Sequence, residues 1–528
     1  MSYALSPSGW TEELQLRAAR WRRLLLPWLL PLALFGLWWL ASHRLWMSDL
    51  VLPPPDRVWG TLLELSVGEL WSHLGISLQR LLFGLLGGIA AGVLLGGWLG
   101  ASRRAETLVY PTFAALAQVP TLAWIPLFML WFGIGEVLKL VVLIKAVIVP
   151  ITVHTLVGVR DAQPGLREAA AVLRLPLRLR LWRLTIPAAL PSFMAGLRLA
   201  LSTGWASLLA VELLASSEGI GYLMVWGRQL FMLDIVFVTI LVIGVIGVAL
   251  DRSVQWFDRR LLYWPHPATA AFQRRSAGRG WQRLLPWLLP LSLLALWQLA
   301  SQAQWVNGEI LAAPSAVLET TWQGLREGTL SHAMLISLGR AVSGLLIGGS
   351  VGLLLGLLLG LYRPAERLLG PTFSALRQVA IFAWVPLLTA WFGLGEGAKL
   401  VFISMATFFP LLIATQRGIA SLSPQLGEAA RTLRLNRRQR LLRLELPGAA
   451  TAIFAGLRLA LIYAWLGTIG AEYFIPSNGG IGSLMIGAQQ LFRMDLVMAG
   501  MLLIGLTGAL LNTLGQLIEK RATRWRHA

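Results

Sequence analysis

The 528-residue sequence contains no cysteine, and this absence excludes disulfide bonds and metal sites built from thiolates. Its six histidines show neither an HExxH motif nor another metal-ligand spacing, so no metal site is predicted. Charged residues are scarce, at 13% of the chain against roughly 25% in soluble globular proteins. Because 56% of the residues are hydrophobic, the sequence predicts an all-α polytopic membrane protein.

A phosphate-binding GxxxxGK[ST] loop is also absent. The nearest segment, GLGEGAKL at 393–400, lacks the Gly-Lys-Ser/Thr ending, and its counterpart at 133–140 reads GIGEVLKL. We interpret both segments as turns between apolar spans, so the chain is predicted to hold no nucleotide and no other cofactor. Because no nucleophile–base or metal-ligand pattern is repeated, a membrane-embedded enzyme is disfavoured.

Acidic residues are few as well: 25 Asp and Glu stand against 45 Lys and Arg, which gives a net charge of +20. The basic residues gather in short runs between apolar stretches, whereas the alternate loops hold few, such as Arg44, Arg57 and Arg228. This distribution follows the positive-inside rule and indicates a cytoplasmic face, not nucleic-acid binding. The basic runs comprise Arg20, Arg22, Arg23, Arg103, Arg104, the arginines from Arg167 to Arg183, Arg252, Arg259, Arg260, Arg274, Arg275, Lys520, Arg521, Arg524 and Arg526.

One long segment occurs twice. Residues 168–200 read EAAAVLRLPLRLRLWRLTIPAALPSFMAGLRLA, and residues 428–460 read EAARTLRLNRRQRLLRLELPGAATAIFAGLRLA, 260 residues later. Parallel repeats of this kind are expected to pack about a pseudo-twofold axis along the membrane normal. We therefore predict a first transmembrane domain at 1–262, a cytoplasmic linker at 263–280 and a second transmembrane domain at 281–528.

Each half is predicted to hold six spans of roughly 20 apolar residues. An even number of spans then separates the two repeated segments, which places both on the basic, cytoplasmic side together with the N- and C-termini. The spans are expected near 24–42, 76–101, 107–132, 137–159, 187–213 and 230–251, and near 283–301, 336–361, 367–392, 397–418, 447–472 and 491–514.

Each repeated segment changes character at a proline. Before Pro187 and Pro447 it is basic and amphipathic, with leucines and arginines at helical spacing, and this pattern predicts a helix at the membrane interface. After the proline the chain is apolar and long enough to begin a membrane span. Pro176 further predicts that the basic part of the first copy is two short helices.

These residues resemble a known family. Glu168-Ala169-Ala170 and Glu428-Ala429-Ala430, each followed by an Ile-Pro or Leu-Pro before a span, resemble the EAA motif of binding-protein-dependent ABC importer permeases. The segments HLGISLQRLLFG, Gln-Val-Pro and LWFGIGE are similar to the nitrate, sulfonate, taurine and bicarbonate branch. Most members carry one such unit and work as dimers, so this chain resembles two type I permease units fused in tandem.

The resemblance implies a non-catalytic permease of a bacterial inner membrane, present as one copy per complex and forming the path for a small, nitrate-, sulfonate- or taurine-like anion. Its implied partners are membrane lipids, two cytoplasmic ABC ATPase subunits that bind ATP and Mg, and a periplasmic or lipid-anchored solute-binding protein. The loop helices at 165–174 and 426–434 are implied to dock into the ATPases.

The sequence departs from the family where a glycine usually stands six residues after the glutamate. Arg174 and Arg434 occupy these positions. Either the turn is remodelled, with Pro176 and Asn436 forming it by other means, or the ATPase contact is more electrostatic. A third interpretation is that these arginines bind anionic lipid headgroups.

Charged residues inside spans are the other candidates for function. Glu212 and Glu472 lie near the outer ends of their spans, before GIG segments. One hypothesis is that they fix an outer gate by bonding to backbone donors there; the alternative is that they lie in the headgroup zone and only cap a helix.

Arg198 and Arg458 either line the path and attract an anion or pair with a carboxylate such as Asp234 or Asp495, which is the favoured interpretation. Trp205 and Trp465 are expected mainly to pack, although both face a plausible path. Lys145 has Met405 as its counterpart and so belongs to one half only.

A self-sufficient secondary transporter or channel is the competing function. Parallel repeats and buried charges suit it equally well. It predicts uptake without an ATPase, however, and it gives the two basic loop helices no role.

Overall fold

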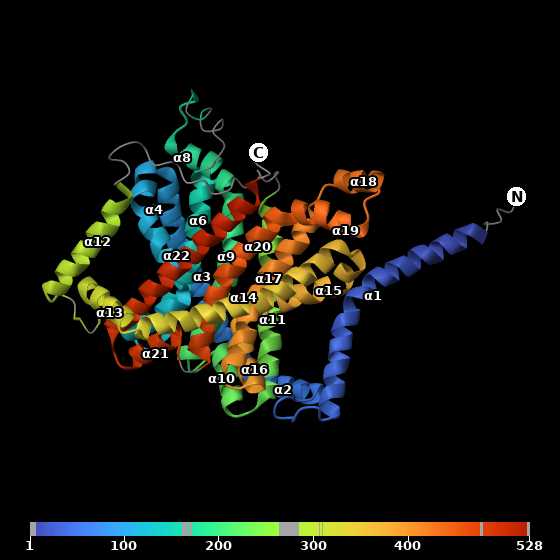
Figure 1. Cartoon of the computed structure of the whole chain (residues 1–528), viewed down its shortest axis with the longest axis horizontal. Helices are drawn as coiled ribbons and strands as arrows, with labels where there is room; N and C mark the ends of the chain where they lie inside the picture. The colour runs from blue at the N-terminus through green and yellow to red at the C-terminus, as the bar shows by residue number, and fades with distance from the viewer. Residues whose placement is uncertain are drawn as a thin grey trace.

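A computed structural model describes residues 7–160, 168, 170, 172–262, 285–305, 307–308, 310–475 and 479–524. Within these ranges the secondary structure is helical, without a strand (Figure 1). The predicted linker at 263–280 and Ala169 of the first EAA segment lie outside the described residues.

The two halves contain corresponding helices in the same order. The first half comprises α1 (Pro7–His43), α2 (Pro55–Val67), α3 (Glu69–Ala101), α4 (Arg103–Gln118), α5 (Ile125–Phe132), α6 (Glu136–Arg160), α8 (Leu177–Arg180), α9 (Ile186–Ala215), α10 (Ile220–Gln229) and α11 (Leu233–Leu261). The second comprises α12 (Leu285–Gln302), α13 (Pro314–Arg326), α14 (Thr329–Leu361), α15 (Arg363–Leu376), α16 (Val385–Phe392), α17 (Glu396–Ala420), α18 (Pro424–Thr432), α19 (Arg437–Arg440), α20 (Leu446–Phe474), α21 (Ile481–Gln490) and α22 (Met494–Ala522).

Nine helices of the described ranges are long and apolar enough to cross a membrane, and the number rises to 11 when two bent pairs are each taken as one span. These pairs correct the straight spans predicted at 107–132 and 367–392. The chain bends by 88° between α4 and the 3-10 turn at Thr121–Trp124, and by 89° at the equivalent place in the second half. Pro120 and Ala380 both have extended backbone there, so the break does not require a proline.

Close helix packing forms the centre of each half. A Cβ added at Gly88 of α3 would lie 2.5 Å from the Val147 Cβ of α6, so only glycine permits this approach. Glycines recur at every fourth position along the same faces of α3 and α14. They are Gly84, Gly88, Gly92, Gly96 and Gly100, and Gly344, Gly348, Gly352, Gly356 and Gly360.

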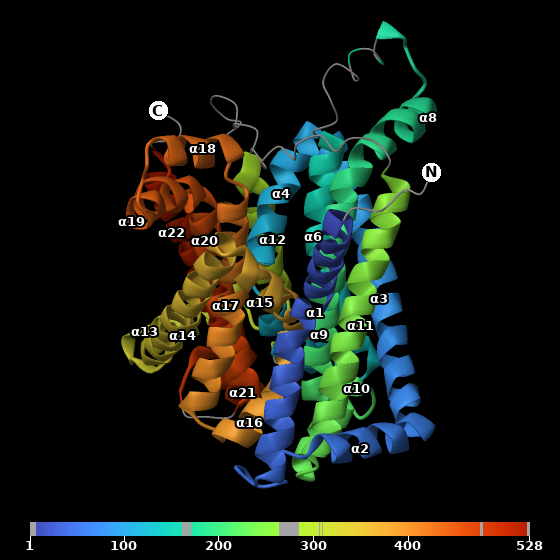
Figure 2. The same cartoon turned by 90° about the vertical axis from the view of Figure 1, so that its right-hand side faces the viewer.

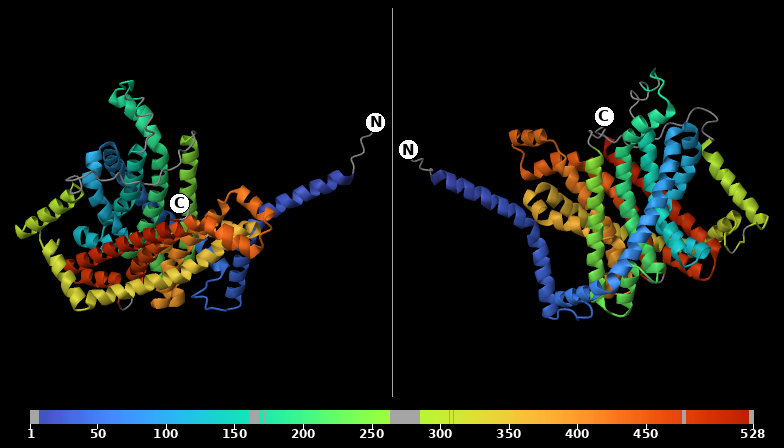
Figure 3. Two further views of the ribbon diagram at one scale, coloured as in Figure 1. Left: turned by 45° about the horizontal axis from the view of Figure 1, so that its top comes forward. Right: turned by 180° about the vertical axis from the view of Figure 1, so that it is seen from behind.

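Each half sends its first long helix to the other half. Helix α1 packs along α15, and α12 packs along α4, so these two helices lie on opposite flanks of the bundle (Figure 3). The loops that follow are held by tryptophans of the opposite half: Trp391 Nε1 donates to the Val51 carbonyl at 3.0 Å, and Trp131 Nε1 donates to the Ile310 carbonyl at 2.7 Å. The halves are therefore interlocked reciprocally.

The two ends of the bundle hold different segments. Helix α8, which follows the first EAA segment, and α18, which contains the second, lie at one end, whereas α2, α10 and α16 lie at the other (Figure 2). Helix α9 runs from the first end to the second, and its counterpart α20 does the same in the second half.

Candidate functional site

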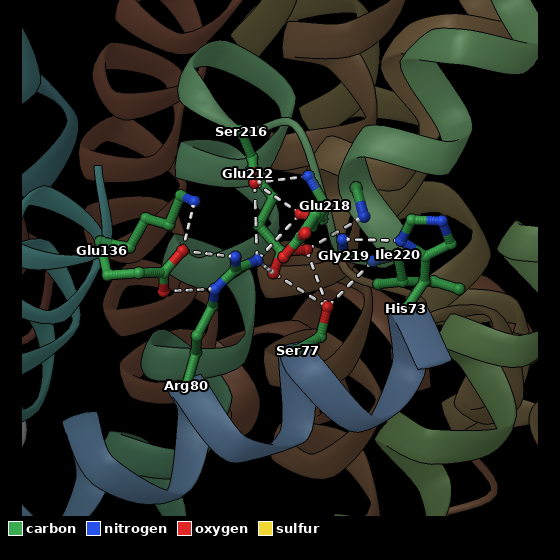
Figure 4. Close-up of polar contacts among 11 residues, drawn as sticks. His73, Ser77, Arg80, Glu136, Glu212, Ser216, Glu218, Gly219 and Ile220 are labelled. Atoms are coloured by element: carbon green, nitrogen blue, oxygen red, sulfur yellow. Dashed lines mark hydrogen bonds and ion pairs between the residues drawn. The ribbon is translucent and has the colours of Figure 1, made fainter. Parts of the chain in front are cut away.

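A buried arginine links three helices at the end of the bundle opposite the EAA segments. Arg80 of α3 forms a bidentate pair with Glu136 at the start of α6, at 2.6 and 2.8 Å (Figure 4). Its Nη1 donates to Glu212 of α9 at 2.9 Å and to the Glu218 carbonyl at 2.8 Å. One guanidinium therefore fixes α3, α6, α9 and the loop before α10 to one another.

The Glu212 carboxylate also holds the start of α10. It accepts hydrogen bonds from the Gly221 backbone N–H at 3.0 Å and from the Ser77 hydroxyl at 2.8 Å. Ser77 Oγ in turn accepts the Ile220 N–H at 2.9 Å. Because the first N–H groups of a helix lack partners within it, these two side chains cap α10.

The second half repeats the arrangement. Arg340 donates to Glu396 at 2.7 Å and to Glu472 at 2.7 Å. Glu472 accepts the Gly482 N–H at 2.8 Å, and Ser337 Oγ accepts the Ile481 N–H at 2.9 Å. We call the two groups the arginine–glutamate clusters; they are Ser77, Arg80, Glu136, Lys139 and Glu212, and Ser337, Arg340, Glu396, Lys399 and Glu472.

Burial makes the balance of charge in each cluster important. Arg80 is 4% exposed and Glu212 is 1% exposed, whereas the Glu136 side chain is 58% exposed. Lys139 Nζ lies 2.7 Å from Glu136, so the first cluster contains two carboxylates and two cations. Buried charges are tolerated when they are paired and hydrogen-bonded, and this cluster meets both conditions.

Gly219 is needed for the cluster to close. Its φ of +106° lies in a region that other residues rarely adopt, and an added Cβ would lie 2.4 Å from Glu212 Oε1. Gly480 repeats this conformation with a φ of +104°. The GIG segments therefore bring the backbone onto the carboxylate before the helix starts.

The structure places Glu212 and Glu472 on the backbone donors expected of them. The same contacts cap α10 and α21, so the capping is observed, and the gating role of the two glutamates stays a hypothesis. Sequence reasoning missed Arg80, Arg340 and their serines. The available signal was that each recurs, as a polar residue in an apolar span, in the two matching segments that begin at His73 and His332.

The predicted partners of Arg198 and Arg458 are wrong. Arg198 lies 3.3 Å from Asp258, and Arg458 lies 3.6 Å from Glu519 and 3.0 Å from Asn512. Helices α9 and α11 run antiparallel, so Arg198, in the first half of α9, meets the last turn of α11. Asp234 and Asp495 begin α11 and α22 at the other end of the bundle, where Thr61 and Thr320 donate to them at 2.7 and 2.8 Å.

Trp205 and Trp465 are buried, at 4% and 2% exposure. Trp465 Nε1 donates to the Ile504 carbonyl of α22 at 3.1 Å. Both indoles pack within the apolar interior in this structure.

The EAA segments lead into two identical turns. Glu168 and Glu428 are exposed, and Ala170 and Ala430 are buried. Arg174 and Arg434 have φ values of +47° and +48°, which is the left-handed conformation that favours glycine. Leu175 N–H and Leu435 N–H each donate back to the alanine at 3.1 Å. This is a helix-ending motif usually built with glycine.

The hypothesis that Pro176 and Asn436 form a remodelled turn is therefore wrong, because Arg174 and Arg434 themselves adopt the left-handed conformation that glycine favours. Asn436 does not form the turn; its side chain accepts the Gln439 N–H at 2.8 Å and caps α19. Both copies are split into two helices, so the split predicted from Pro176 for the first copy does not need that proline.

The boundary predicted at Pro187 and Pro447 also needs correction. The chain is one continuous helix from Arg178 to Ala215, and from Arg437 to Phe474 in the second half. A π-helical turn at 181–185, and another at 441–445, stands just before each proline. A π turn shifts the backbone hydrogen bonds by one residue and so accommodates proline, which lacks an N–H. The basic segment before the proline and the membrane span after it therefore form one continuous helix, which we call the rod.

Comparison with known proteins fits this duplicated architecture. A family model described as "Binding-protein-dependent transport system inner membrane component" matches residues 88–263 and again residues 348–526. Together the two matches cover more than half of the chain. The chain belongs to this family. It is a tandem, multi-pass permease component of a binding-protein-dependent importer, and importers of this kind work with an ATPase and a solute-binding protein.

Individual relatives match about half of this permease each. The aliphatic sulfonates transport permease protein SsuC of Escherichia coli is 39% identical over 246 residues, which are 47% of this chain and 93% of the relative. The Bacillus subtilis protein of the same name is 36% identical over 48% of this chain and 92% of its own length. The taurine transport system permease protein TauC of Escherichia coli is 32% identical, over 44% and 86%.

Proposed function

We propose that this permease forms the whole translocation path of an ATP-driven importer for small sulfonate anions, with both halves in one chain. The observation that carries the proposal is that both ends of the path are duplicated within the chain. Two EAA turns with the same left-handed geometry lie at one end, and two arginine–glutamate clusters lie at the other. The relatives named for aliphatic sulfonates and taurine support the solute class.

The permease itself makes and breaks no covalent bond in this proposal. One copy assembles with two ATPase subunits, which bind ATP and Mg, and with a periplasmic or lipid-anchored receptor that delivers the solute. The EAA turns, including Glu168, Ala170, Glu428, Ala429 and Ala430, contact the ATPases on the cytoplasmic side, where both chain termini also lie. The basic residues around these turns support this orientation.

Continuity between the turn and the span provides a route for the coupling. Each EAA turn is followed by a helix of 38 residues that ends at the arginine–glutamate cluster. Closure of the ATPases on ATP would move both turns, and a continuous rod transmits that movement to Glu212 and Glu472. The central path then switches between inward and outward access.

Reconstitution tests the proposal directly. The permease, its ATPase and its solute receptor, purified together and placed in vesicles, should accumulate ethanesulfonate only when ATP and receptor are both present. The matched control is the same complex with an ATPase variant that binds ATP without hydrolysing it. Uptake that persists in this control would overturn the proposal in favour of a secondary transporter or channel.

A further inference from the structure

Lys145 is a cation on the membrane-spanning helix α6 whose hydrogen-bond partners are neutral. Its Nζ donates to the Val119 carbonyl at 2.8 Å and to Thr121 Oγ1 at 3.3 Å, and it lies 5.5 Å from the centre of the Trp124 ring. All three partners belong to the break between α4 and α5. An ammonium has three N–H donors, so these contacts leave one donor uncommitted.

Lys145 is half-buried, and the missing carboxylate distinguishes it from the buried arginines of the described chain. Arg80 pairs with Glu136 and Glu212, Arg160 with Glu106, and Arg340 with Glu396 and Glu472. The described residues provide no such ion pair for Lys145. A charge within a membrane span is costly, and an unpaired one is expected where it serves a function.

The break lies where the two halves meet. Val119 Cγ2 is 2.8 Å from the position of a Cβ built on Gly505 of α22, in the second half. Val119 and Trp124 also pack against the same apolar cluster as Trp465 and Ile504 of that half. In a two-fold permease the solute crosses between the halves, so Lys145 stands beside the contact that must open.

The second half shows that the fold does not need a lysine at this position. Met405 takes its place and packs against the same apolar cluster. The break beside Met405 bends by 89°, against 88° beside Lys145. A methionine therefore supports the same backbone, and the ammonium is free for another role.

We propose that Lys145 binds the sulfonate group of the solute as it passes between the halves, on one side of the path only. This inference rests on the proposed function, since it names the residue that recognises the anion. The ammonium supplies the positive charge and an uncommitted donor, and the surrounding apolar cluster accommodates the aliphatic part of the solute.

The test uses the complete transporter in vesicles, with ethanesulfonate as the probe. Lys145→Met copies the residue of the second half, Lys145→Arg keeps the charge, and Lys145→Gln keeps a neutral donor. Arg252→Gln is the control, because it removes an exposed cation of α11 that lies outside the break, the arginine–glutamate clusters and the EAA turns. Uptake and receptor-stimulated ATP hydrolysis are measured for each.

Loss of a charge-assisted hydrogen bond corresponds to about a tenfold loss of affinity for the anion. Lys145→Met and Lys145→Gln should therefore slow ethanesulfonate uptake by about that factor. Lys145→Arg and Arg252→Gln should stay within about threefold of the unmodified protein. ATP hydrolysis stimulated by the receptor should persist in all four, which shows that each variant is folded and assembled.

Two results would overturn the inference alone: wild-type uptake by Lys145→Met, or full rescue by Lys145→Gln, which would mean that Lys145 only braces the break. If the unmodified transporter imports no ethanesulfonate with ATP and receptor present, the proposed function itself fails, and the inference fails with it.

Discussion

Arg80 and Glu212 form an ion pair at 2.9 Å although they are 132 residues apart and both are buried. The same guanidinium holds Glu136, so the far end of the rod that begins at the EAA turn is tied to α3 and α6. Arg340 and Glu472 form the equivalent pair at 2.7 Å. The structure therefore connects each EAA turn to a charge cluster through a single helix.

Replacement of the two glutamates by glutamine tests whether these clusters act as a gate. In Glu212→Gln the amide nitrogen must face a donor, either the Gly221 N–H or Arg80, and Glu472→Gln creates the same conflict. We expect each change to cost about 1–3 kcal/mol of stability. ATP hydrolysis without receptor should rise and ethanesulfonate uptake per ATP should fall. The measurements are thermal unfolding, basal ATPase activity and uptake.

Glu319→Gln is the control, since this exposed glutamate of α13 lies outside the clusters. If ethanesulfonate uptake per ATP is unchanged in both cluster variants, Glu212 and Glu472 have no gating role and serve only to cap α10 and α21.

A comparison of alanine at Gly219 with alanine at Gly133 separates two effects: the clash of a new Cβ with Glu212, and the strain of the backbone conformation. Gly219 has φ +106° and ψ +170°, and Gly133 has φ +68° and ψ −173°, so alanine is strained at both by about 1–3 kcal/mol. A Cβ at Gly133 meets nothing within 4 Å, whereas at Gly219 it meets Glu212. Gly219→Ala should therefore lower the melting temperature clearly more than Gly133→Ala does. Equal losses would show that the carboxylate moves aside freely.

The sequence was sufficient for the features that depend on local pattern or on the repeat. Composition predicted the membrane, and the repeat predicted two equivalent halves. The position of Glu212 before a GIG segment led to the hypothesis that it bonds to backbone donors there, and Gly221 N–H is such a donor. These features arise from residues close in sequence or from a comparison of the chain with itself.

Features that depend on how the helices pack, bend or continue were not predicted from the sequence. The pairing of Arg198 with Asp258 follows from the antiparallel packing of α9 and α11, and hydropathy contains no such information. The sharp bends at Pro120 and Ala380 were hidden because both arms are apolar. Pro187 was taken as a boundary, but the π turn before it keeps the helix continuous.

Arginine at the EAA turn leads to a prediction about local stability. The left-handed conformation costs a residue other than glycine about 1–2 kcal/mol. Glycine avoids this strain but loses more backbone entropy on folding, which offsets about 0.5–1 kcal/mol of the gain. Arg434→Gly should therefore slow hydrogen exchange of the Leu435 amide, which is bonded to Ala430, by a factor of about two to ten. Hydrogen exchange followed by mass spectrometry measures this.

Arg434→Ala separates the guanidinium from the backbone, because alanine keeps the strained conformation. It should not slow the exchange, and Arg174→Gly should reproduce the effect of Arg434→Gly in the first half. If the guanidinium contacts the ATPase, both Arg434 variants will weaken ATPase binding, most clearly at low salt. Faster exchange in Arg434→Gly would contradict the strain argument.

The reciprocal tryptophans should control how firmly the two halves are interlocked. Trp391 in the second half donates to Val51 in the loop after α1, and Trp131 in the first half donates to Ile310 in the loop after α12. Replacement by phenylalanine keeps most of the ring but removes the donor, at a cost of about 0.5–1.5 kcal/mol for each bond.

Because each bond joins elements of different halves, Trp391→Phe should speed hydrogen exchange in the loop around Val51 and leave the loop around Ile310 unchanged. Trp131→Phe should do the reverse, so each variant is the control for the other. Faster exchange in both loops with either variant would mean that the two tryptophan contacts open together. Unchanged exchange would mean that packing of the rings alone holds the loops.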